Sequence, residues 1–285
     1  MSLIDSVVNT LQGTGIVTGH IRFVDRPAAT DTVVAEFNEP TMGFAVYDAL
    51  GVEALVSAVS AEDCEGFRFA LLPTGAATPY DIRKRIEDWA GVARSDEAIV
   101  LGQLGDQVTW RRDRLMLIGD PARTREILRA VIEFAYYEGN LHRMEREVDT
   151  YLRAAENDIS LTHQVTDSDL ARWPRANEGV KLATLLRMHY VRLETRLERP
   201  SSNLAGPARR LVAELALQVD VADRLVAVDD RIEVLQDLYE SATDRLSEYS
   251  YFRREYRLEV GIIIVLVVEV IAIIWEITLL TRAGR

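Results

Sequence analysis

The C-terminal stretch from Val260 to Leu280 is almost purely aliphatic, and it restricts the fold of this chain more than any other feature. Fifteen of its residues are Val, Ile or Leu. A helix rises about 1.5 Å per residue, so this stretch reaches roughly 30 Å, the thickness of a bilayer's hydrocarbon core. A core helix of a soluble protein is the alternative, but such helices seldom stay apolar on every side for so long. We therefore predict a single transmembrane helix at residues 259–281, followed by a tail at residues 282–285.

Two acidic residues lie inside the predicted transmembrane helix, Glu269 near its middle and Glu276 one heptad later. Each aliphatic side chain near the bilayer centre favours insertion by about 0.3 to 0.6 kcal/mol, whereas one acid there costs on the order of 3 kcal/mol. The aliphatic sum exceeds that cost, so both acids are expected to enter the membrane, protonated or hydrogen-bonded. They share one face, which we interpret as a contact with a neighbouring helix inside the bilayer. A bond to a headgroup and an ion or proton path are the alternatives.

Composition limits the remaining part of the chain. The 285 residues carry a net charge of −12, and 48% of them are hydrophobic. This length allows one or two packed domains besides the anchor, and the acidic balance argues against a surface that coats nucleic acid. The first residues, MSLIDSVVNTLQG, contain no basic region and no long apolar run, so no signal or transit peptide is expected. Cys64 is the only cysteine, which excludes an intramolecular disulfide.

Arginines flank the predicted anchor unevenly. Arg253, Arg254 and Arg257 precede it, and Arg282 and Arg285 follow it. The positive-inside rule then predicts a cytoplasmic body and a translocated tail, which is the layout of a tail-anchored protein. We expect a bacterial inner membrane, or the mitochondrial inner membrane if the protein is eukaryotic. The helix would hold the three preceding arginines at headgroup depth, so they are predicted to bind anionic lipid headgroups.

Residues 15–119 predict an α+β domain, preceded by an N-terminal segment at residues 1–14. Alternating apolar and polar residues, with Gly and Pro between the runs, are typical of strands. Strands are expected at residues 16–24, 32–37, 67–72, 98–103, 107–111 and 114–118, the last three forming a meander that turns at Gly105 and Asp106. Helical spacing predicts helices at residues 44–60 and 80–90.

Residues 120–219 predict a helical domain. Asp120 and Pro121 are typical of a helix start, as N-cap and first helical residue. Inward positions then recur at spacings of four and three residues up to Ile159, interrupted by two acids, Glu138 and Glu145. The further elements expected are a break at residues 167–174, a helix at residues 177–199 and another that Pro207 opens.

Residues 220–258 predict a long, regular helix that continues into the anchor. Its apolar stripe keeps the four-three spacing of a coiled coil for four heptads, and the helix contains neither Pro nor Gly. The stripe includes Leu225, Val228, Ile232, Leu235, Tyr239 and Leu246. Two interpretations remain open, packing on the helix predicted from residue 121 of the same chain and pairing with a second copy. In either case we expect a rigid stalk that leads to the membrane.

This C-terminal region resembles a known family. The pattern begins with Asp229 or Asp230, continues with Arg231, Ile232, Glu233, Val234 and Leu235, then with Arg257, Leu258 and Glu259, and ends with Glu269. It is similar to the end of the RMND1/Rmd1/Sif2 family, also called DUF155 or YagE-like. The likeness covers Val221 to Ile274, about a fifth of the chain. It implies an α+β part, a helical part, a stalk and one membrane span in a homo-oligomer without established catalysis. Eukaryotic relatives sit in the mitochondrial inner membrane and support mitochondrial translation, whereas prokaryotic relatives have no settled role.

Catalytic and cofactor-binding motifs are absent from the sequence. It contains no P-loop, no dinucleotide-binding glycine pattern, no nucleophile elbow and no histidine pair with the spacing of a zinc site. The four histidines and the acidic stretch around Cys64 are therefore interpreted as surface groups. Two basic clusters, Arg83 to Arg85 and Arg111 to Arg114, are interpreted as ordinary surface charge, with a site for anionic lipid or an RNA backbone as the alternative. No catalytic, cofactor-binding or metal-binding residue is predicted.

The functional hypothesis is a membrane-anchored, homo-oligomeric, non-catalytic scaffold that assembles through its stalk and transmembrane helix and binds a protein client. No direct binding of nucleic acid is expected. One alternative is an ion channel or transporter that uses Glu269. A second is a membrane-tethered enzyme with its site in residues 15–119, and a deep cleft in which carboxylates or arginines converge would favour it.

Overall fold

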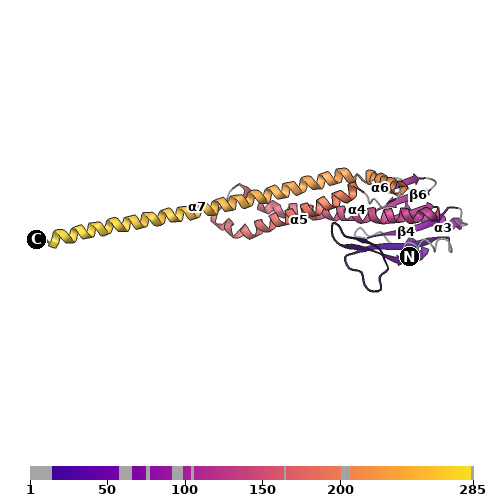
Figure 1. Cartoon of the computed structure of the whole chain (residues 1–285), viewed down its shortest axis with the longest axis horizontal. Helices are drawn as coiled ribbons and strands as arrows, with labels where there is room; N and C mark the ends of the chain where they lie inside the picture. The colour runs from indigo at the N-terminus through magenta and orange to yellow at the C-terminus, as the bar shows by residue number, and fades with distance from the viewer. Residues whose placement is uncertain are drawn as a thin grey trace. The chain divides into compact units, whose positions relative to one another are not determined.

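The computed structural model describes residues 15–57, 66–74, 78–91, 99–103, 106–163, 165–199, 204 and 206–283. The chain forms an α+β N-terminal part with a seven-stranded sheet, then helices, then a long C-terminal helix (Figure 1). The predicted fold class is thereby confirmed. The chain packs as two compact units, Met1–Val148 with Leu186–Asp230 and Asp149–Leu185 with Arg231–Arg285. Helices α4, α5 and α7 contribute residues to both units.

The sheet belongs to the first unit and is mixed. Its strands are β1 (Val17–Val24), β2 (Val33–Phe37), β3 (Gly43–Ala49), β4 (Gly66–Pro73), β5 (Ile99–Gln103), β6 (Asp106–Arg111) and β7 (Arg114–Gly119). Their order is β2-β3-β1-β4-β7-β6-β5. Neighbouring strands are antiparallel except for β4 and β7, which are parallel. All six predicted strands are found within one residue of their expected ends, and the meander of β5, β6 and β7 is confirmed.

The prediction of a helix at residues 44–60 is wrong in its first half. Residues 43–49 form β3, a strand between β1 and β2, and the helix that follows, α2, covers only Val52–Ser57. Phe44, Val46 and Tyr47 are aromatic or β-branched, types that fit a pleated, paired surface. Ala45 and Val46 are both fully buried because the strand is covered on both faces. A strand covered in this way lacks the alternation from which strands are recognised in a sequence. Residues 58–60 of the predicted helix lie outside the described residues.

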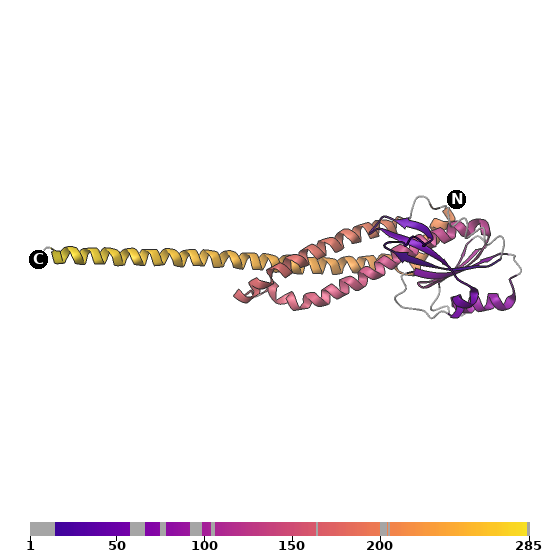
Figure 2. The same cartoon turned by 90° about the horizontal axis from the view of Figure 1, so that it is seen from below.

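Helices cover both faces of the sheet. Helix α2 and helix α3 (Tyr80–Ala90), which begins and ends where predicted, cover one face. The buried side chains of that layer are Leu55, Ala70, Leu72, Ile86, Trp89, Ala90 and Met116. Phe67 and Trp110 point to the other face, since successive strand residues alternate, and they contact aromatic rings there. Figure 2 shows the strands of the sheet between α3 and the N-terminal part of α4.

Aromatic contacts join the sheet to α4 (Pro121–Ala155), which starts at the predicted proline. The ring of Phe37 on β2 stacks on that of Tyr136 at 3.9 Å between centroids, and the Tyr136 hydroxyl donates a hydrogen bond to the carbonyl of Thr41 over 3.0 Å. Trp110 on β6 meets Phe134 edge to face at 6.2 Å. Stacked and edge-to-face pairs of this kind each add about 0.5–1.5 kcal/mol beyond the burial of area. The edge strand β2 and the inner strand β6 therefore both pack on one helix.

The helical part differs from the prediction at its joints. Helix α4 ends at Ala155 and continues as a 3₁₀ helix, η1 (Glu156–Thr162), and Ile159 is exposed instead of inward. The expected break contains a second 3₁₀ helix, η2 (Asp167–Arg172), and α5 (Trp173–Glu198) begins four residues early. Pro174 lies in the first turn of α5, where no backbone N–H is needed, so it starts the helix and does not break it. Helix α6 (Gly206–Gln218) and helix α7 (Val221–Ala283) complete the chain.

The second unit has its own small core and its own buried charge. Leu161, Ala176, Ala242 and Leu246 are buried together. The carboxylate of Asp158, which is 1% exposed, forms ion pairs with Arg172 and Arg175 and accepts a hydrogen bond from the Tyr239 hydroxyl. Gly179 permits this packing, because a Cβ atom there would lie 2.4 Å from the Tyr239 ring.

Gly66, at the start of β4, is a position that no other residue fits. Its φ of +147° disfavours L side chains, and an added Cβ would lie 2.0 Å from the carbonyl oxygen of Ile21. We expect Gly66→Ala to lower the free energy of unfolding by about 2 kcal/mol or more, since it combines backbone strain with a clash against backbone. Urea unfolding of the full chain in detergent micelles measures this change.

Gly102→Ala is the matched control for Gly66→Ala. Gly102 also lies in a strand, β5, but an added Cβ would meet no atom within 4 Å. Its effect is expected to stay within about 0.5 kcal/mol. Equal losses in the two variants would contradict the close approach of β4 to β1 at Gly66.

Candidate functional site: the C-terminal anchor and a charged cleft

Helix α7 contains the predicted membrane anchor. Among the described residues it is the only helix long and apolar enough to cross a membrane, and none of its most apolar window is buried. Its large apolar side chains from Ile262 to Trp275 are between 50% and 69% exposed. Such a continuous apolar surface is unfavourable in water at about 25 cal/mol per Å². The most apolar window of the anchor is therefore not buried within the described part of this chain.

The predicted intramembrane acids both lie on α7. Glu269 is exposed, and the backbone of Glu276 is helical, while its side chain lies outside the described residues. Seven residues make almost two helical turns, with a drift of about 20°, so both positions share one face of α7. The contact of these acids with a neighbouring helix stays a prediction.

The apolar stripe of the stalk is buried inside the chain. In the first unit Leu225 and Val228 are 4% and 0% exposed. In the second unit the stripe residues Ile232, Leu235, Tyr239 and Leu246 are all 7% exposed or less. The stripe therefore packs within its own chain, which is one of the two alternatives that the sequence left open. The predicted oligomer seam is therefore corrected, because side chains buried in one chain offer no free surface to a second copy.

The three arginines before the anchor do not have the same surroundings. Arg253 forms an ion pair with Asp167 at 3.1 Å, and the hydroxyl of Tyr249 donates to the same carboxylate over 3.1 Å. Arg254 and Arg257 are exposed. The prediction of headgroup contacts therefore stays open for Arg254 and Arg257, while Arg253 has a partner within the second unit.

The first unit contains a charged site that the sequence did not predict. Glu138, one of the two acids on the inward face of α4, is only 3% exposed. Its Oε1 accepts hydrogen bonds from Arg112 Nη2 at 2.6 Å and from Arg224 Nη1 at 2.9 Å. Arg112 follows β6 directly, and Arg224 lies in the first turn of α7. One buried carboxylate therefore connects the sheet, α4 and the start of α7.

Glu145, the second acid, extends the same network. Arg224 donates to both of its carboxylate oxygens, from Nε at 2.7 Å and from Nη2 at 2.9 Å. The Nδ1 of His142 lies 3.3 Å from Glu145 Oε2. The bidentate geometry suits an arginine fork and makes this a strong, directional ion pair. His142 is thus a member of the site and not the independent surface histidine that the sequence suggested.

The hydrogen bonds and charges of this network shift the pKa values of its members. Burial alone would raise the pKa of the Glu138 carboxyl, but the hydrogen bonds and charges of Arg112 and Arg224 outweigh burial and hold this pKa below its ordinary value. Burial likewise opposes ionisation of Glu145, and Arg224 and His142 hold its pKa low. Burial disfavours the charged form of Arg224 as well, yet the two glutamates raise its pKa. All three groups are therefore charged at neutral pH.

The network lines a cleft of about 470 Å³. The walls come from β5, β6, α4 and the start of α7, and they include Ile99, Trp110, Arg111, Arg112, Glu138, His142, Glu145, Val219 and Arg224. All of these residues belong to the first unit. Carboxylates and arginines thus converge in a cleft, which is the observation that would favour ligand binding or an enzyme. Only part of its lining comes from residues 15–119, where the sequence-based alternative placed such a site.

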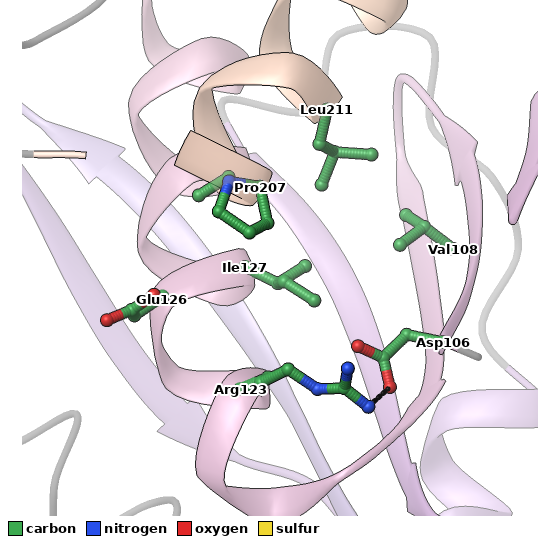
Figure 3. Close-up of a pocket in the computed structure, with 8 residues that line it drawn as sticks. Asp106, Val108, Arg123, Glu126, Ile127, Pro207 and Leu211 are labelled. Carbon is green, nitrogen blue, oxygen red and sulfur yellow. Dashed lines mark hydrogen bonds and ion pairs between the residues drawn. The ribbon is translucent and has the colours of Figure 1, made fainter. Parts of the chain in front are cut away.

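A second, smaller cavity lies on the same unit and has a structural role. Figure 3 shows its lining, in which the carboxylate of Asp106 faces Arg123 across the cavity's edge. Asp106 Oδ1 accepts from Arg123 Nη2 at 3.1 Å and from the backbone N–H of Asp120 at 3.0 Å. The volume, about 30 Å³, suits one or two waters and no organic ligand. Asp106, which was expected in a turn, thus fixes the start of α4 from β6.

The basic clusters noted in the sequence are largely paired. Arg83 and Arg85 form ion pairs with Glu87 and Glu53, at 2.8 and 2.6 Å. Arg114 donates to Asp113 at 3.0 Å and to the carbonyl of Trp89 at 2.6 Å. Of these clusters, only Arg111 and Arg112 line the cleft. The acidic stretch around Cys64 lies outside the described residues, and among those that are described no group of His, Cys, Asp or Glu is placed to hold a metal ion.

Comparisons with known proteins leave the family open. A scan of the sequence against protein-family models finds no match, and a search of curated proteins finds none either. The likeness to the RMND1/Rmd1/Sif2 family therefore stays a prediction that rests on the residues between Val221 and Ile274.

The buried carboxylate makes stability depend on pH. Because the folded-state pKa of Glu138 is lowered, its stabilising effect is complete above the unfolded-state pKa of about 4.3 and is lost as pH falls through the lowered value. We expect Glu138→Gln to cost about 3 kcal/mol at pH 7, since it breaks a buried charge network, and to cost less at pH 3. Urea unfolding of the full chain in detergent between pH 7 and pH 3 tests both statements.

Glu147→Gln provides the control, because Glu147 lies on the same helix and is exposed. Its effect should remain below about 0.5 kcal/mol over the whole pH range. A Glu138→Gln variant as stable as the wild type at pH 7 would contradict the buried network.

Proposed function

We propose that this protein is a single-pass, membrane-anchored scaffold of the RMND1/DUF155 type, which has no catalytic role, holds its α+β domain at a membrane and assembles with copies of itself. The observation that carries the proposal is the exposed aliphatic surface of α7, where each large apolar side chain from Ile262 to Trp275 is at least 50% exposed. A bilayer removes that surface from water without any protein partner. The unbroken helix from Val221 to Ala283 supports a stiff connection from the folded part to the membrane.

The charges beside the anchor support a proposed orientation. Arg254 and Arg257 are exposed on the near side, together with the aromatic side chains of Tyr251, Phe252 and Tyr256. Arginine beside anionic headgroups and aromatic rings at the interface are the usual boundary of a membrane span. We therefore propose a cytoplasmic body in a bacterial inner membrane, or the equivalent orientation in a mitochondrial inner membrane, with an unidentified protein client.

Assembly with further copies is proposed to use the anchor and not the stalk. The stalk stripe is buried within each chain, whereas Glu269 is exposed on the anchor. An acid in hydrocarbon is stabilised when it hydrogen-bonds to another helix, and such bonds contribute about 1 kcal/mol each. The shared face of Glu269 and Glu276 offers that contact to the same face of another copy.

Membrane fractionation tests the anchor. We expect the full chain to stay with membranes through an alkaline carbonate wash, because an inserted helix is held by its apolar surface and not by charge. A chain that ends at Leu258 is expected in the supernatant. A chain in which residues 260–280 are replaced by an unrelated aliphatic helix should return to the membrane. Full-length protein released by the wash would refute the anchor.

Crosslinking in liposomes tests the assembly. We expect the wild-type chain to form crosslinked multimers, and Glu269→Leu to reduce their yield about fivefold, as the loss of one interhelical hydrogen bond of about 1 kcal/mol predicts. Val270→Leu changes the neighbouring position and keeps the acid, so it should behave as wild type. A wild-type chain that remains monomeric in liposomes and in detergent would exclude the homo-oligomer while leaving the anchor intact.

A further inference from the structure

We propose that the cleft between β6, the middle of α4 and the start of α7 binds a phosphate monoester group. This inference goes beyond the scaffold and does not depend on the anchor, since every wall of the cleft belongs to the first unit. Its volume of about 470 Å³ lies within the usual range of small-molecule sites, roughly 300–1,000 Å³.

The accessible charge in the cleft is positive. The side chains of Arg112 and Arg111 are 48% and 36% exposed. By contrast, the side chain of Glu138 is 4% exposed, while those of Glu145 and Arg224 are 20% and 21% exposed and pair with each other. The whole chain has a net charge of −12, so a cleft with three arginines is a local feature and not a consequence of a basic protein. An anion entering it meets cations first.

Glu138 holds two guanidinium groups side by side. Arg112 Nη2 and Arg224 Nη1 donate to the same oxygen of Glu138. Arg112 also donates from its Nε to Glu138 Oε2 over 3.3 Å, and its side chain lines the cleft. Guanidinium groups match the geometry of phosphate oxygens and can donate two parallel hydrogen bonds. The buried acid therefore preorganises donors that already line the cleft.

A phosphate monoester fits this arrangement better than a single carboxylate. It carries close to two negative charges at neutral pH and three acceptor oxygens, which three arginines can share. Ile99 and Val219 line the same cleft and are partly exposed, so they offer an apolar surface to the organic part of an ester. Inorganic phosphate would lack that second contact and is expected to bind more weakly.

Isothermal titration of the full chain in detergent micelles tests the site, with phenyl phosphate as the probe. Arg111→Gln is the informative variant, because Arg111 lines the cleft and its partner Asp113 keeps its ion pair with Arg114. We expect saturable binding of phenyl phosphate, with an affinity that falls about tenfold in Arg111→Gln. The affinity for inorganic phosphate is expected to fall by a larger factor, because inorganic phosphate has no organic part to contact the cleft. Arg85→Gln, which removes an exposed ion pair on α3, is the control and should bind as wild type.

A second probe distinguishes a soluble phosphate ester from a lipid headgroup as the natural ligand. Dihexanoyl phosphatidic acid carries the same group on a lipid, and dihexanoyl phosphatidylcholine lacks the free monoester. Binding of phenyl phosphate with equal or higher affinity than the lipid indicates a soluble ester, whereas binding of phosphatidic acid alone indicates a headgroup. Thermal melting confirms that Arg111→Gln is folded. The proposal is overturned if neither phenyl phosphate nor phosphatidic acid shows saturable binding. It is also overturned if the folded Arg111→Gln variant binds them with unchanged affinity.

Discussion

The buried carboxylate of Glu138 is the interaction on which the first unit depends. A charge that is only 3% exposed must be matched where it lies, and the match comes from Arg112 after β6 and Arg224 at the start of α7. Those residues are 26 and 86 positions away from Glu138 in the chain. The Glu138 carboxylate can therefore form its hydrogen bonds only when the sheet, α4 and the start of α7 are packed together. It thus favours this one arrangement of the three elements over others.

The second unit also contains a buried carboxylate that is paired with arginines. Asp158 is 1% exposed and is held by Arg172, Arg175 and the Tyr239 hydroxyl, close to the point where α4 gives way to η1. Tyr239 can pack there because Gly179 has no side chain. Each unit thus fixes one part of α7 by matching a buried acid with arginine, although the acids, the helices and the partners differ. The stalk stripe is buried by this packing, whereas the large apolar side chains of the anchor from Ile262 to Trp275 are exposed.

These features give the proposed scaffold and the proposed phosphate site separate physical origins. The anchor depends on uninterrupted aliphatic side chains, and its environment must be supplied from outside the described chain. The cleft depends on arginines that the fold gathers around Glu138 and that remain partly exposed to solvent. A protein can carry both, since they share no residue, and a ligand in the cleft would contact α4 and the start of α7 directly.

Local signals in the sequence were sufficient for much of the fold. The alternation at β1 and β4, the apolar run at β7, the Pro121 start of α4, the boundaries of α3 and the aliphatic end of α7 are local signals. Each depends on neighbours within a few residues, so the sequence alone determined these elements. It also showed Glu138 and Glu145 at inward positions of α4, which was the available signal for the missed site. The tertiary structure decided which arginines meet those acids, that residues 43–49 pair as a strand between β1 and β2, and that the stalk stripe packs inside the chain. Each of these outcomes depends on contacts between segments far apart in the chain, and the spacing of residues along one segment carries no information about its distant partner.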